Sequence, residues 1–579
     1  MPEPYSVILE GVSFSYEGGG SPVLKEVDLK IKRGEMTAIL GRTGAGKSTL
    51  IYSLGGIIPN YIKGDFTGDV VVEGLNTKDH GLYEIAQHVG VIMDDPEAHI
   101  VSFTVWEDTA FGPCNLGLPA EEIYDRIDFA LKATRLDEMR TRNPYNLSGG
   151  EKQGLAIAGV LSMRPSILAL DEPTSMLDPL GRERVRTVLK DLKERYGMTF
   201  IISDYDANRI IGVADRLVIL DKGEVTLDGR CRDILQDVET LEGVGVHLPE
   251  VTKLAAQLRT DGFWDGELPV TVEETASTMK KRLRQMSLPR PAEVGNYASS
   301  GETMVKIRNL HHVFSGDVHA LRGIDLDIYS GEYIALIGQN GSGKTTLAKH
   351  IGGLLKPTNK DAEIAVAGLD LRNARMRDIA SRVGYIFQIP EHQMFCATVG
   401  EELRFGLKNL GIPEEEADRR AKNVAAKLEL TGLENELLPS LNRGRRFRVV
   451  LGSVIAMNPE VVVVDEPTTG QDWKDSVYVC KFLEELRAGG KTIIMITHEM
   501  DLVASFATRV IALHQGSVLL DGAPKEVFSK TDELEKTWVQ PPDIFRLSMA
   551  LADYGIPPNV LTTDEMRAEI AKLRGRGWS

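Results

Sequence analysis

Two glycine-rich loops of one pattern, far apart in the chain, constrain its fold more than any other feature. Residues 41–48 read GRTGAGKS and residues 338–345 read GQNGSGKT, and both match G-x-x-x-x-G-K-S/T. A short apolar run suited to a strand precedes the first loop, and a helix is expected from its lysine onward. A strand, a loop of this pattern and a helix form the context that holds phosphate groups. The chain is therefore predicted to contain two α/β domains, each with a phosphate-binding loop.

Each loop offers the same chemistry to a nucleotide. Backbone N–H groups and the N-terminus of the following helix would surround the phosphates, the lysine would add a positive charge, and the Ser or Thr hydroxyl would bind Mg²⁺. The expected ATP-binding residues are Gly41, Gly44, Gly46, Lys47, Ser48 and Thr49 in the first half, and Gly338, Gly341, Gly343, Lys344, Thr345 and Thr346 in the second.

An apolar run that ends in two acidic residues follows each loop at a matching distance. Residues 167–170 lead into Asp171 and Glu172, and residues 461–464 lead into Asp465 and Glu466. Each aspartate is predicted to hold Mg²⁺, directly or through water. Each glutamate is placed as the general base that polarises the attacking water.

A third motif lies between the loop and the acidic pair in each half, but it is intact in only one of them. Residues 147–153 read LSGGEKQ, whereas the corresponding residues 441–445 read LNRGR. The phosphate loop, this stretch and the strand ending in Asp-Glu together resemble the pattern of ATP-binding-cassette (ABC) ATPases. The resemblance to a tandem ABC ATPase implies an α/β fold with two P-loop cassettes, each with a RecA-like core and a helical signature subdomain.

The resemblance assigns further residues. Tyr16 and Phe314 lie where the family stacks an aromatic ring on adenine, although Tyr16 taken alone would be a core side chain of a strand. Gln388 matches the Q-loop glutamine, which touches Mg²⁺ and the attacking water. His498 matches the switch histidine. In the signature, a serine hydroxyl and glycines that let backbone N–H groups approach would contact the γ-phosphate, and the residues here are Ser148, Gly149 and Gly150.

The sequence departs from the family pattern at a few positions. Asp94 stands at the Q-loop position of the first half, and Tyr205 stands at its switch position when residues are counted without gaps. A phenol can hydrogen-bond to a phosphate but cannot replace an imidazole that donates, accepts and titrates near neutral pH. In the second half, Asn442 and Arg443 replace the signature serine and its first glycine.

Cassettes of this family pair head to tail, so each ATP would lie between one half's loop and the other half's signature. One composite site would match the consensus throughout: Lys344, Thr345, Gln388, Asp465, Glu466 and His498, facing Ser148, Gly149 and Gly150. The other would hold Lys47, Ser48, Asp94, Asp171, Glu172 and Tyr205, facing Asn442, Arg443 and Gly444. We therefore hypothesise one hydrolytic site and one that mainly binds ATP. Arg443 could either pair with the phosphate or block closure.

The repeat unit is a cassette followed by a short helical segment. Residues 245–249 (GVHLP) precede an expected helix through Leu254 and Leu258, and residues 539–542 (VQPP) precede one through Leu547 and Leu551. We predict a first ABC ATPase domain at 1–229, a helical appendage at 230–285, a linker at 286–302, a second domain at 303–524 and a C-terminal helical appendage at 525–579.

Composition and local sequence argue against several classes of function. The net charge of −17 disfavours nucleic-acid binding, which needs clustered Lys and Arg. No apolar run reaches the roughly 18 residues of a membrane span, and no signal peptide is visible. The four cysteines are scattered without a C-x-x-C, which argues against a metal cluster and for a reducing compartment. We expect a soluble cytosolic protein.

Two stretches resemble one branch of the family. Residues 104–113 (TVWEDTAFGP) and 115–119 (NLGLP), with 405–413 (FGLKNLGIP) in the second half, resemble ATPases of energy-coupling-factor (ECF) importers. This resemblance implies a T-type transmembrane partner whose coupling helices dock near Glu97 and Glu391. It also implies a membrane substrate-binding protein for a vitamin or transition-metal ion, and a location at the cytoplasmic face of the membrane.

Other classes remain open. Tandem ABC ATPases that act on ribosomes carry a long basic linker or cysteine-rich motifs, which this chain lacks. The ATPase of a sugar importer shares the chemistry, but residues 111–119 (FGPCNLGLP) and the helical appendages favour the ECF interpretation. A non-catalytic regulator is disfavoured because Lys344, Gln388, Glu466 and His498 form a complete set.

Overall fold

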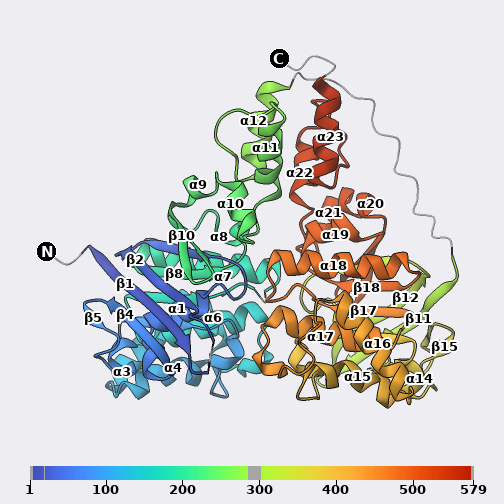
Figure 1. Ribbon diagram of the computed structural model, residues 1–579, viewed down its shortest axis with the longest axis horizontal. Coiled ribbons are helices and arrows are strands. Elements are labelled where there is room, and N and C mark those ends of the chain that lie inside the picture. The colour runs from blue at the N-terminus through green and yellow to red at the C-terminus, as the bar shows by residue number, and fades with distance from the viewer. Residues whose placement is uncertain (1–3, 19, 176, 284–300, 575–579) are drawn as a thin grey trace. The chain divides into compact units, whose positions relative to one another are not determined.

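The computed structural model describes residues 4–18, 20–175, 177–283 and 301–574. The chain divides into two compact units, Met1–Pro249 and Glu250–Ser579. Each unit contains a six-stranded sheet and a four-stranded sheet, with helices around them (Figure 1). Both predicted α/β domains are therefore present.

In the first unit, the six-stranded sheet has the order β10-β9-β3-β8-β7-β6 and is parallel except between β9 and β10. Its strands are β3 (Met36–Leu40), β6 (Val89–Ile92), β7 (Ile167–Asp171), β8 (Thr199–Asp204), β9 (Arg216–Asp221) and β10 (Glu224–Arg230). The antiparallel sheet β2-β1-β4-β5 consists of β1 (Tyr5–Tyr16), β2 (Leu24–Lys32), β4 (Gly64–Val72) and β5 (Leu75–Asn76).

The central strands are apolar because both of their faces are covered. Every residue of β3, β7 and β8 is buried, as expected for parallel strands between layers of other elements. The helices of this unit are α1 (Lys47–Leu54), α2 (Ile57–Asn60), α3 (Leu82–Ile85), α4 (Val105–Asn115), α5 (Ala120–Ala133), α6 (Gly149–Leu161), α7 (Pro179–Tyr196), α8 (Ala207–Ile210), α9 (Cys231–Ile234) and α10 (Val238–Gly243).

Helices α4, α5 and α6 pack on one another and form the predicted helical subdomain of the first unit. Thr104 caps α4 by accepting a hydrogen bond from the Glu107 N–H, which fixes where that helix begins. Ser148 caps α6, and Ser148 and Glu151 form a capping box. The signature motif is therefore the N-terminus of a helix.

The second unit repeats this arrangement. Its six-stranded sheet has the order β16-β17-β18-β13-β19-β20, from β13 (Tyr333–Ile337), β16 (Val383–Ile386), β17 (Val461–Asp465), β18 (Thr492–Ile496), β19 (Arg509–His514) and β20 (Ser517–Gly522). Its four-stranded sheet has the order β12-β11-β14-β15, from β11 (Thr303–Phe314), β12 (Val318–Tyr329), β14 (Glu363–Val366) and β15 (Leu369–Asp370). Its cassette helices are α13 (Lys344–Ile351), α14 (Met376–Ala380), α15 (Val399–Asn409), α16 (Glu414–Lys427), α17 (Arg443–Ala456), α18 (Trp473–Ala488) and α19 (Met500–Phe506).

Helices from both predicted appendages lie in the second unit and pack on one another (Figure 1). They are α11 (Glu250–Thr260) and α12 (Val272–Arg282), then α22 (Asp543–Ala550) and α23 (Thr563–Arg574); the short α20 (Pro524–Ser529) and α21 (Thr531–Glu535) precede α22. Arg546 bonds to Glu273 at 3.0 Å, and Arg567 bonds to Asp261 at 2.5 Å. Most of the predicted linker at 286–302 lies outside the described residues.

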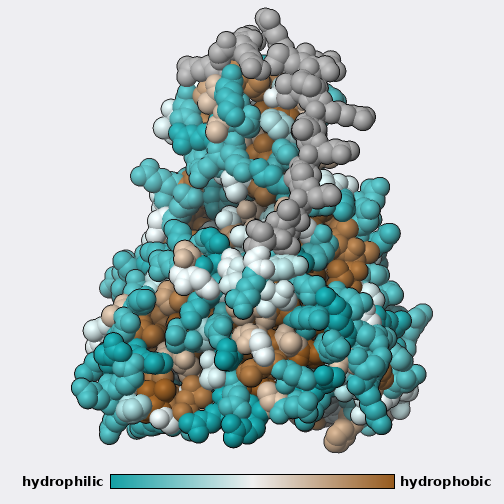
Figure 2. All heavy atoms as spheres, turned by 90° about the vertical axis from the view of Figure 1, so that its right-hand side faces the viewer, coloured by the Kyte–Doolittle hydropathy of each residue, from teal (hydrophilic) through white to brown (hydrophobic). Residues whose placement is uncertain are grey.

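Among the helices that the structure describes, none combines the length and the apolar character needed to cross a membrane. On the face shown in Figure 2, hydrophilic side chains predominate and apolar side chains form separate patches.

Candidate functional site

The second phosphate loop joins β13 to α13 and wraps around its lysine. Lys344 is buried, and its Nζ donates hydrogen bonds to the carbonyls of Gly338 (2.6 Å) and Gln339 (3.1 Å). Gly343 has φ +104°, and a Cβ there would lie 2.6 Å from the Ala320 carbonyl oxygen. Only glycine fits this turn, which leaves the loop N–H groups free of side-chain cover. Thr345, at the start of α13, is exposed.

Oxygen atoms suited to Mg²⁺ gather beside this loop. Thr345 Oγ1 donates to Asp465 Oδ1 at 3.4 Å, and the Tyr385 hydroxyl donates to Asp465 Oδ2 at 3.0 Å. Burial raises the pKa of Asp465, and the neighbouring Glu466 acts in the same direction. A hydroxyl and a carboxylate are the hard oxygen ligands that Mg²⁺ prefers, so these residues fit that ion.

Of the three predicted catalytic residues of the second unit, His498 and Glu466 lie in direct contact. His498 Nε2 is 3.0 Å from Glu466 Oε1 and 3.2 Å from Asn340 Oδ1. The contact arises because β18 lies between β17 and β13, so the residues that follow β17 and β18 meet at one sheet edge. Gln388 is exposed, and among the described residues its side chain forms no hydrogen bond with Asp465 or Glu466.

The first phosphate loop has the same shape but a different partner for its glutamate. Lys47 Nζ donates to the carbonyls of Gly41 (2.8 Å) and Arg42 (3.2 Å), and lies 3.5 Å from Glu172 Oε1. Glu172 is thus paired with the loop lysine, whereas Glu466 is paired with the switch histidine.

Asp171 and Asp465 each accept a hydrogen bond from a neighbouring strand, but the two strands flank them on opposite sides: β8 beside Asp171 and β16 beside Asp465. Ser203, on β8, and Ser48 both hydrogen-bond to the Asp171 carboxylate. Burial raises the pKa of Asp171 to about 6; these hydrogen bonds oppose the shift, while the charges of Glu172 and Asp94 add to it. Asp94 therefore adds negative charge to a carboxylate-rich site.

The sheet register gives the same switch equivalence as the ungapped count. Ile39 pairs with Ser203 and Leu336 pairs with Ile496, and both Ile39 and Leu336 stand two residues before the first loop glycine. Tyr205 and His498 therefore occupy equivalent positions. Among the described residues, however, the Glu172 carboxylate forms no hydrogen bond with Tyr205.

The predicted adenine-stacking residues end the first strand of each unit. The Tyr16 hydroxyl bonds to Thr49 Oγ1 at 2.9 Å, and its ring meets Phe14 edge-on at 4.9 Å. Phe314 is 44% exposed, and His312 meets its ring at 4.5 Å. Phe314 presents the more open ring.

The two signatures differ in what surrounds them. A Cβ at Gly150 would lie 2.9 Å from Gly181 Cα, so that position has room only for glycine. In the second unit, Asn442 caps α17 by accepting from the Arg445 N–H at 2.9 Å. A Cβ added to Gly470 would lie 2.5 Å from Arg443 Cζ, so the Arg443 guanidinium rests on the backbone of the segment after Glu466 in its own unit.

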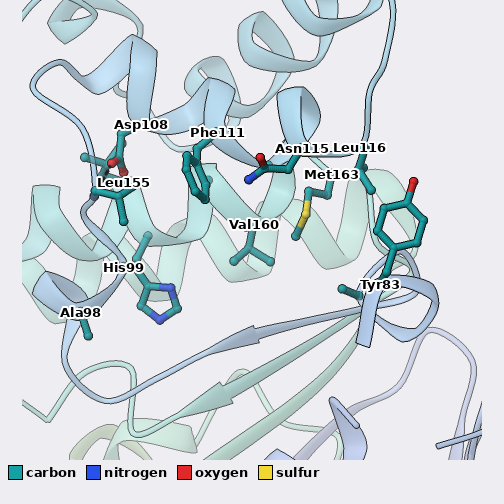
Figure 3. A pocket seen from close by; sticks show the side chains of 15 residues that line it. Tyr83, Ala98, His99, Asp108, Phe111, Asn115, Leu116, Leu155, Val160 and Met163 are labelled. Carbon is teal, nitrogen blue, oxygen red and sulfur yellow. Dashed lines mark hydrogen bonds between the residues drawn. The ribbon is translucent and has the colours of Figure 1, made fainter. Parts of the chain in front are cut away.

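An apolar pocket of about 390 Å³ lies in the first unit between α4 and α6, beside the turn Pro96–His99 (Figure 3). Its lining includes Tyr83, Val101, Phe111, Leu116, Val160 and Met163. His99 Nε2 accepts a hydrogen bond from the Met93 N–H at 2.9 Å, and burial lowers the pKa of His99, so an uncharged ring faces this space. The Lys152–Glu97 ion pair bridges the turn and α6; Arg446 and Glu391 repeat it in the second unit at 2.5 Å.

Sequence reasoning missed Tyr385, Ser203 and Arg209, which contact predicted site residues. A position-by-position comparison of the two halves could have found them, because the residue type differs at each of these positions. The other half has Val91 in place of Tyr385, Ile496 in place of Ser203 and Leu502 in place of Arg209.

The sequence of this chain matches a known protein family in both halves. The family model described as "ABC transporter" matches residues 24–175 and 321–469. A protein of Caldanaerobacter subterraneus subsp. tengcongensis, named "Putative ABC transporter ATP-binding protein TTE1589", is 36% identical over 551 residues, covering 94% of this chain and 96% of the relative. A protein of Bacillus subtilis strain 168, named "Putative HMP/thiamine import ATP-binding protein YkoD", is 31% identical over 525 residues, covering 90% and 92%. The solved structure of cbiO1 from Clostridium perfringens, described as part of the ABC transporter complex cbiONQ, is 33% identical with a TM-score of 0.37, covering 42% of this chain and 97% of that chain.

Proposed function

This chain belongs to the ABC transporter family, and we propose that it is the ATPase subunit of a membrane importer of the energy-coupling-factor type. The predicted tandem of two ABC cassettes is confirmed by the family match in both halves and by relatives that align over nearly the whole chain. The chain is an ATPase that uses ATP with Mg²⁺. The importer, its partners and the division of labour between the sites are the proposal.

The observation that carries the importer proposal is the apolar pocket of the first unit. Its rim exposes Tyr83, Val101 and Phe111 by 61%, 57% and 52%. Large apolar side chains gathered at an exposed hollow are typical of a protein interface rather than of a free surface. The pocket lies between two helices, so it suits the apolar face of a third helix. We assign it to a coupling helix of the T-type transmembrane subunit.

The position of the pocket connects it to the nucleotide. The turn Pro96–His99 borders the pocket and begins two residues after Asp94, whose charge reaches Asp171. A helix seated in the pocket would therefore sense changes at the first phosphate loop. In the second unit, Phe395 and Phe405 stack at 5.3 Å at the equivalent positions, with Phe395 68% exposed, which would serve a second coupling helix.

The relative named for HMP/thiamine import supports a vitamin-type substrate. We propose that a separate membrane protein captures a vitamin or a transition-metal ion, and that this chain acts at the cytoplasmic face of the membrane. ATP binding would favour closure of the cassettes, and hydrolysis would reopen them.

We further propose that the two ATP sites differ. In the head-to-tail pairing of the family, the second loop would work with Ser148, Gly149 and Gly150, and Glu466 would activate water next to His498. The Glu466–His498 contact supports this assignment, because an imidazole beside the base can take up and return a proton. The first site, with Glu172 paired to Lys47, would mainly hold ATP.

A pull-down tests the importer proposal. Tagged protein is recovered from detergent-solubilised membranes of its own organism, and bound proteins are identified by mass spectrometry. We expect a multi-helix membrane subunit and a small integral substrate-binding protein, whose identity would name the substrate. Recovery of ribosomal proteins, or of a sugar-importer permease, would overturn the proposal and leave the ATPase assignment intact.

A variant locates the docking site. We expect Phe111→Asp to abolish recovery of the membrane subunit, because a charge in the pocket opposes seating of an apolar helix. Tyr61→Asp, at an aromatic residue of the same unit that is 77% exposed and does not line the pocket, is the control and should leave recovery unchanged. Equal recovery with both variants would exclude this pocket as the docking site.

A further inference from the structure

A buried arginine lies against the switch residue of the first unit, at a position where the second unit has leucine. Arg209 stands four residues after Tyr205, as Leu502 stands four residues after His498. The Arg209 side chain is 5% exposed and forms ion pairs with Asp204 (3.5 Å) and Asp206 (3.4 Å), whose side chains are 1% and 5% exposed. The second unit has Thr497 at the position of Asp204, so this charged pair is particular to the first switch.

Arg209 contacts Tyr205 in two ways. Its Nη2 donates a hydrogen bond to the Tyr205 hydroxyl at 2.9 Å, and its Cζ lies 4.6 Å from the centre of the Tyr205 ring. A guanidinium that both stacks on a phenol ring and donates to its oxygen fixes the position of the ring as well as of the hydroxyl. Tyr205 is 5% exposed.

The backbone of the first switch is fixed as well. Asp204 Oδ1 accepts hydrogen bonds from the N–H groups of Tyr205 (2.8 Å) and Asp206 (3.0 Å). On the other side, the His247 N–H donates to the Tyr205 carbonyl at 3.0 Å, and the Ala207 N–H donates to the His247 carbonyl at 2.9 Å. The segment from Asp204 to Ala207 is therefore held by side-chain and main-chain bonds together.

The two units also differ in the partner of the catalytic glutamate. In the second unit, His498 reaches Glu466 at 3.0 Å. In the first unit, Tyr205 is held against Arg209, and the partner of Glu172 is Lys47 at 3.5 Å. Burying an arginine with two aspartates is costly unless they are paired, and such groups can serve to specify one conformation.

We propose that Arg209 is a positioning residue that keeps Tyr205 away from Glu172, so that ATP in the first loop is retained rather than hydrolysed. This inference rests on the proposed difference between the two sites, and it names what maintains that difference. Replacing Tyr205 alone would then be insufficient to restore hydrolysis, because Asp204 and Arg209 would still hold the switch segment.

The proposal is tested by measuring ATP turnover in a Glu466→Gln background. The second site is inactive in this background, so the turnover that remains reports on the first site. We expect Tyr205→His alone to change ATP turnover less than about twofold, and Tyr205→His with Asp204→Thr and Arg209→Leu to raise it about tenfold or more. Asp204→Thr and Arg209→Leu together remove one charge of each sign, and thermal melting establishes that the variants fold. A full increase from Tyr205→His alone, or no increase from the folded triple variant, would overturn the proposal.

The rate of ATP release from the first site distinguishes a positioning role of Arg209 from a purely structural one. We expect Asp204→Thr with Arg209→Leu to change the release rate about threefold when Tyr205 is present, and not to change it in a Tyr205→Ala background, because the effect passes through the ring and hydroxyl of Tyr205. An equal change in both backgrounds would overturn the proposal. Failure of the two-site proposal would instead appear as equal turnover losses in single Glu466→Gln and Glu172→Gln variants.

Discussion

Residues of the same type in the same motif have different neighbours in the two halves of this chain. Glu172 and Glu466 both follow the aspartate that ends a buried strand, yet one contacts a lysine and the other a histidine. A lysine holds a carboxylate in its charged form, whereas a histidine can also exchange a proton with it. The chemistry of a glutamate here therefore depends on its partner more than on its motif.

Isosteric variants of the two glutamates test this difference. We expect Glu466→Gln to lower steady-state ATP turnover about 100-fold, because glutamine cannot act as a base. Glu172→Gln should lower it less than about threefold, because its site contributes little turnover. Phosphate release at saturating ATP measures both, and nucleotide-binding titrations control for lost affinity. Losses of equal size would show that both sites hydrolyse.

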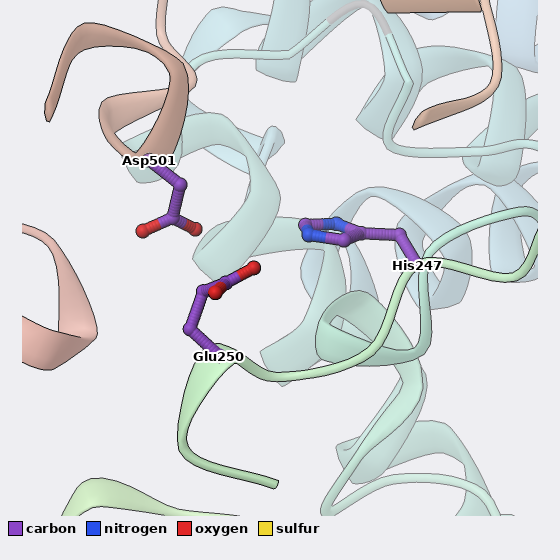
Figure 4. Close-up of side chains that lie close together, drawn as sticks. All are labelled: His247, Glu250 and Asp501. Atoms are coloured by element: carbon purple, nitrogen blue, oxygen red, sulfur yellow. The ribbon is translucent and has the colours of Figure 1, made fainter. Parts of the chain in front are cut away.

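At the scale of elements, helices from the two predicted appendages join in one unit. Besides the contacts of Arg546 and Arg567, Thr563 Oγ1 donates to Glu250 Oε2 at 2.7 Å. The carboxylates of Glu250 and Asp501 lie within 4.8 Å of each other where α11 approaches α19 (Figure 4). Burial raises the pKa of Asp501 well above its ordinary value, and Glu250 and Asp543 act in the same direction. This junction therefore holds more acidic groups than it can keep charged at low cost.

Neutralising Asp501 should stabilise the protein. A carboxyl group whose pKa is higher in the folded state binds more protons there, so stability falls as pH rises above the ordinary pKa of 3.8. We expect Asp501→Asn to raise the melting temperature by about 2 °C or more at pH 7.5, and by less near pH 5. Calorimetry measures both. Asp532→Asn, at an exposed aspartate of the same unit, is the control, and a lower melting temperature for Asp501→Asn at pH 7.5 would contradict the expectation.

At the scale of the whole molecule, one chain carries two cassettes that are alike in fold and unlike in their sites. Fusion raises the effective concentration of each half for the other and fixes their ratio at one to one. It also makes the differences permanent, because a homodimer could not hold Tyr205 in one switch and a histidine in the other. In the division of labour that we propose, this asymmetry would let one site retain nucleotide while the other turns over.

Matched substitutions of the two loop lysines test whether the first site retains ATP while the second hydrolyses it. Lys47 and Lys344 are 4% and 6% exposed and make equivalent bonds to their loops. After incubation with MgATP and rapid desalting, we expect Lys47→Ala to lose the retained ATP, and Lys344→Ala to keep it while losing turnover. Radiolabelled ATP measures retention. The opposite pattern would reverse the assignment of the two sites.

The sequence by itself determined the two α/β cassettes and the elements that carry each motif. A phosphate loop needs a strand before it and a helix after it, and the short apolar runs before Asp171 and Asp465 have the length of buried strands, as the structure confirms. These are local requirements, so pattern and spacing suffice to read them. The ABC family match in both halves bears out this part of the prediction.

The tertiary structure alone decided the partners of these residues. Strand order brings Ser203 to Asp171, Tyr385 to Asp465 and His498 to Glu466 across many intervening residues. The apolar pocket forms in the same way, from segments between Tyr83 and Met163, and helices α11 and α12 group with the second unit through long-range packing. Such contacts depend on how twisted sheets and helices pack in three dimensions, which local periodicity does not encode. The sequence could therefore name the two switch residues, but only the folded chain holds one against a glutamate and the other against Arg209.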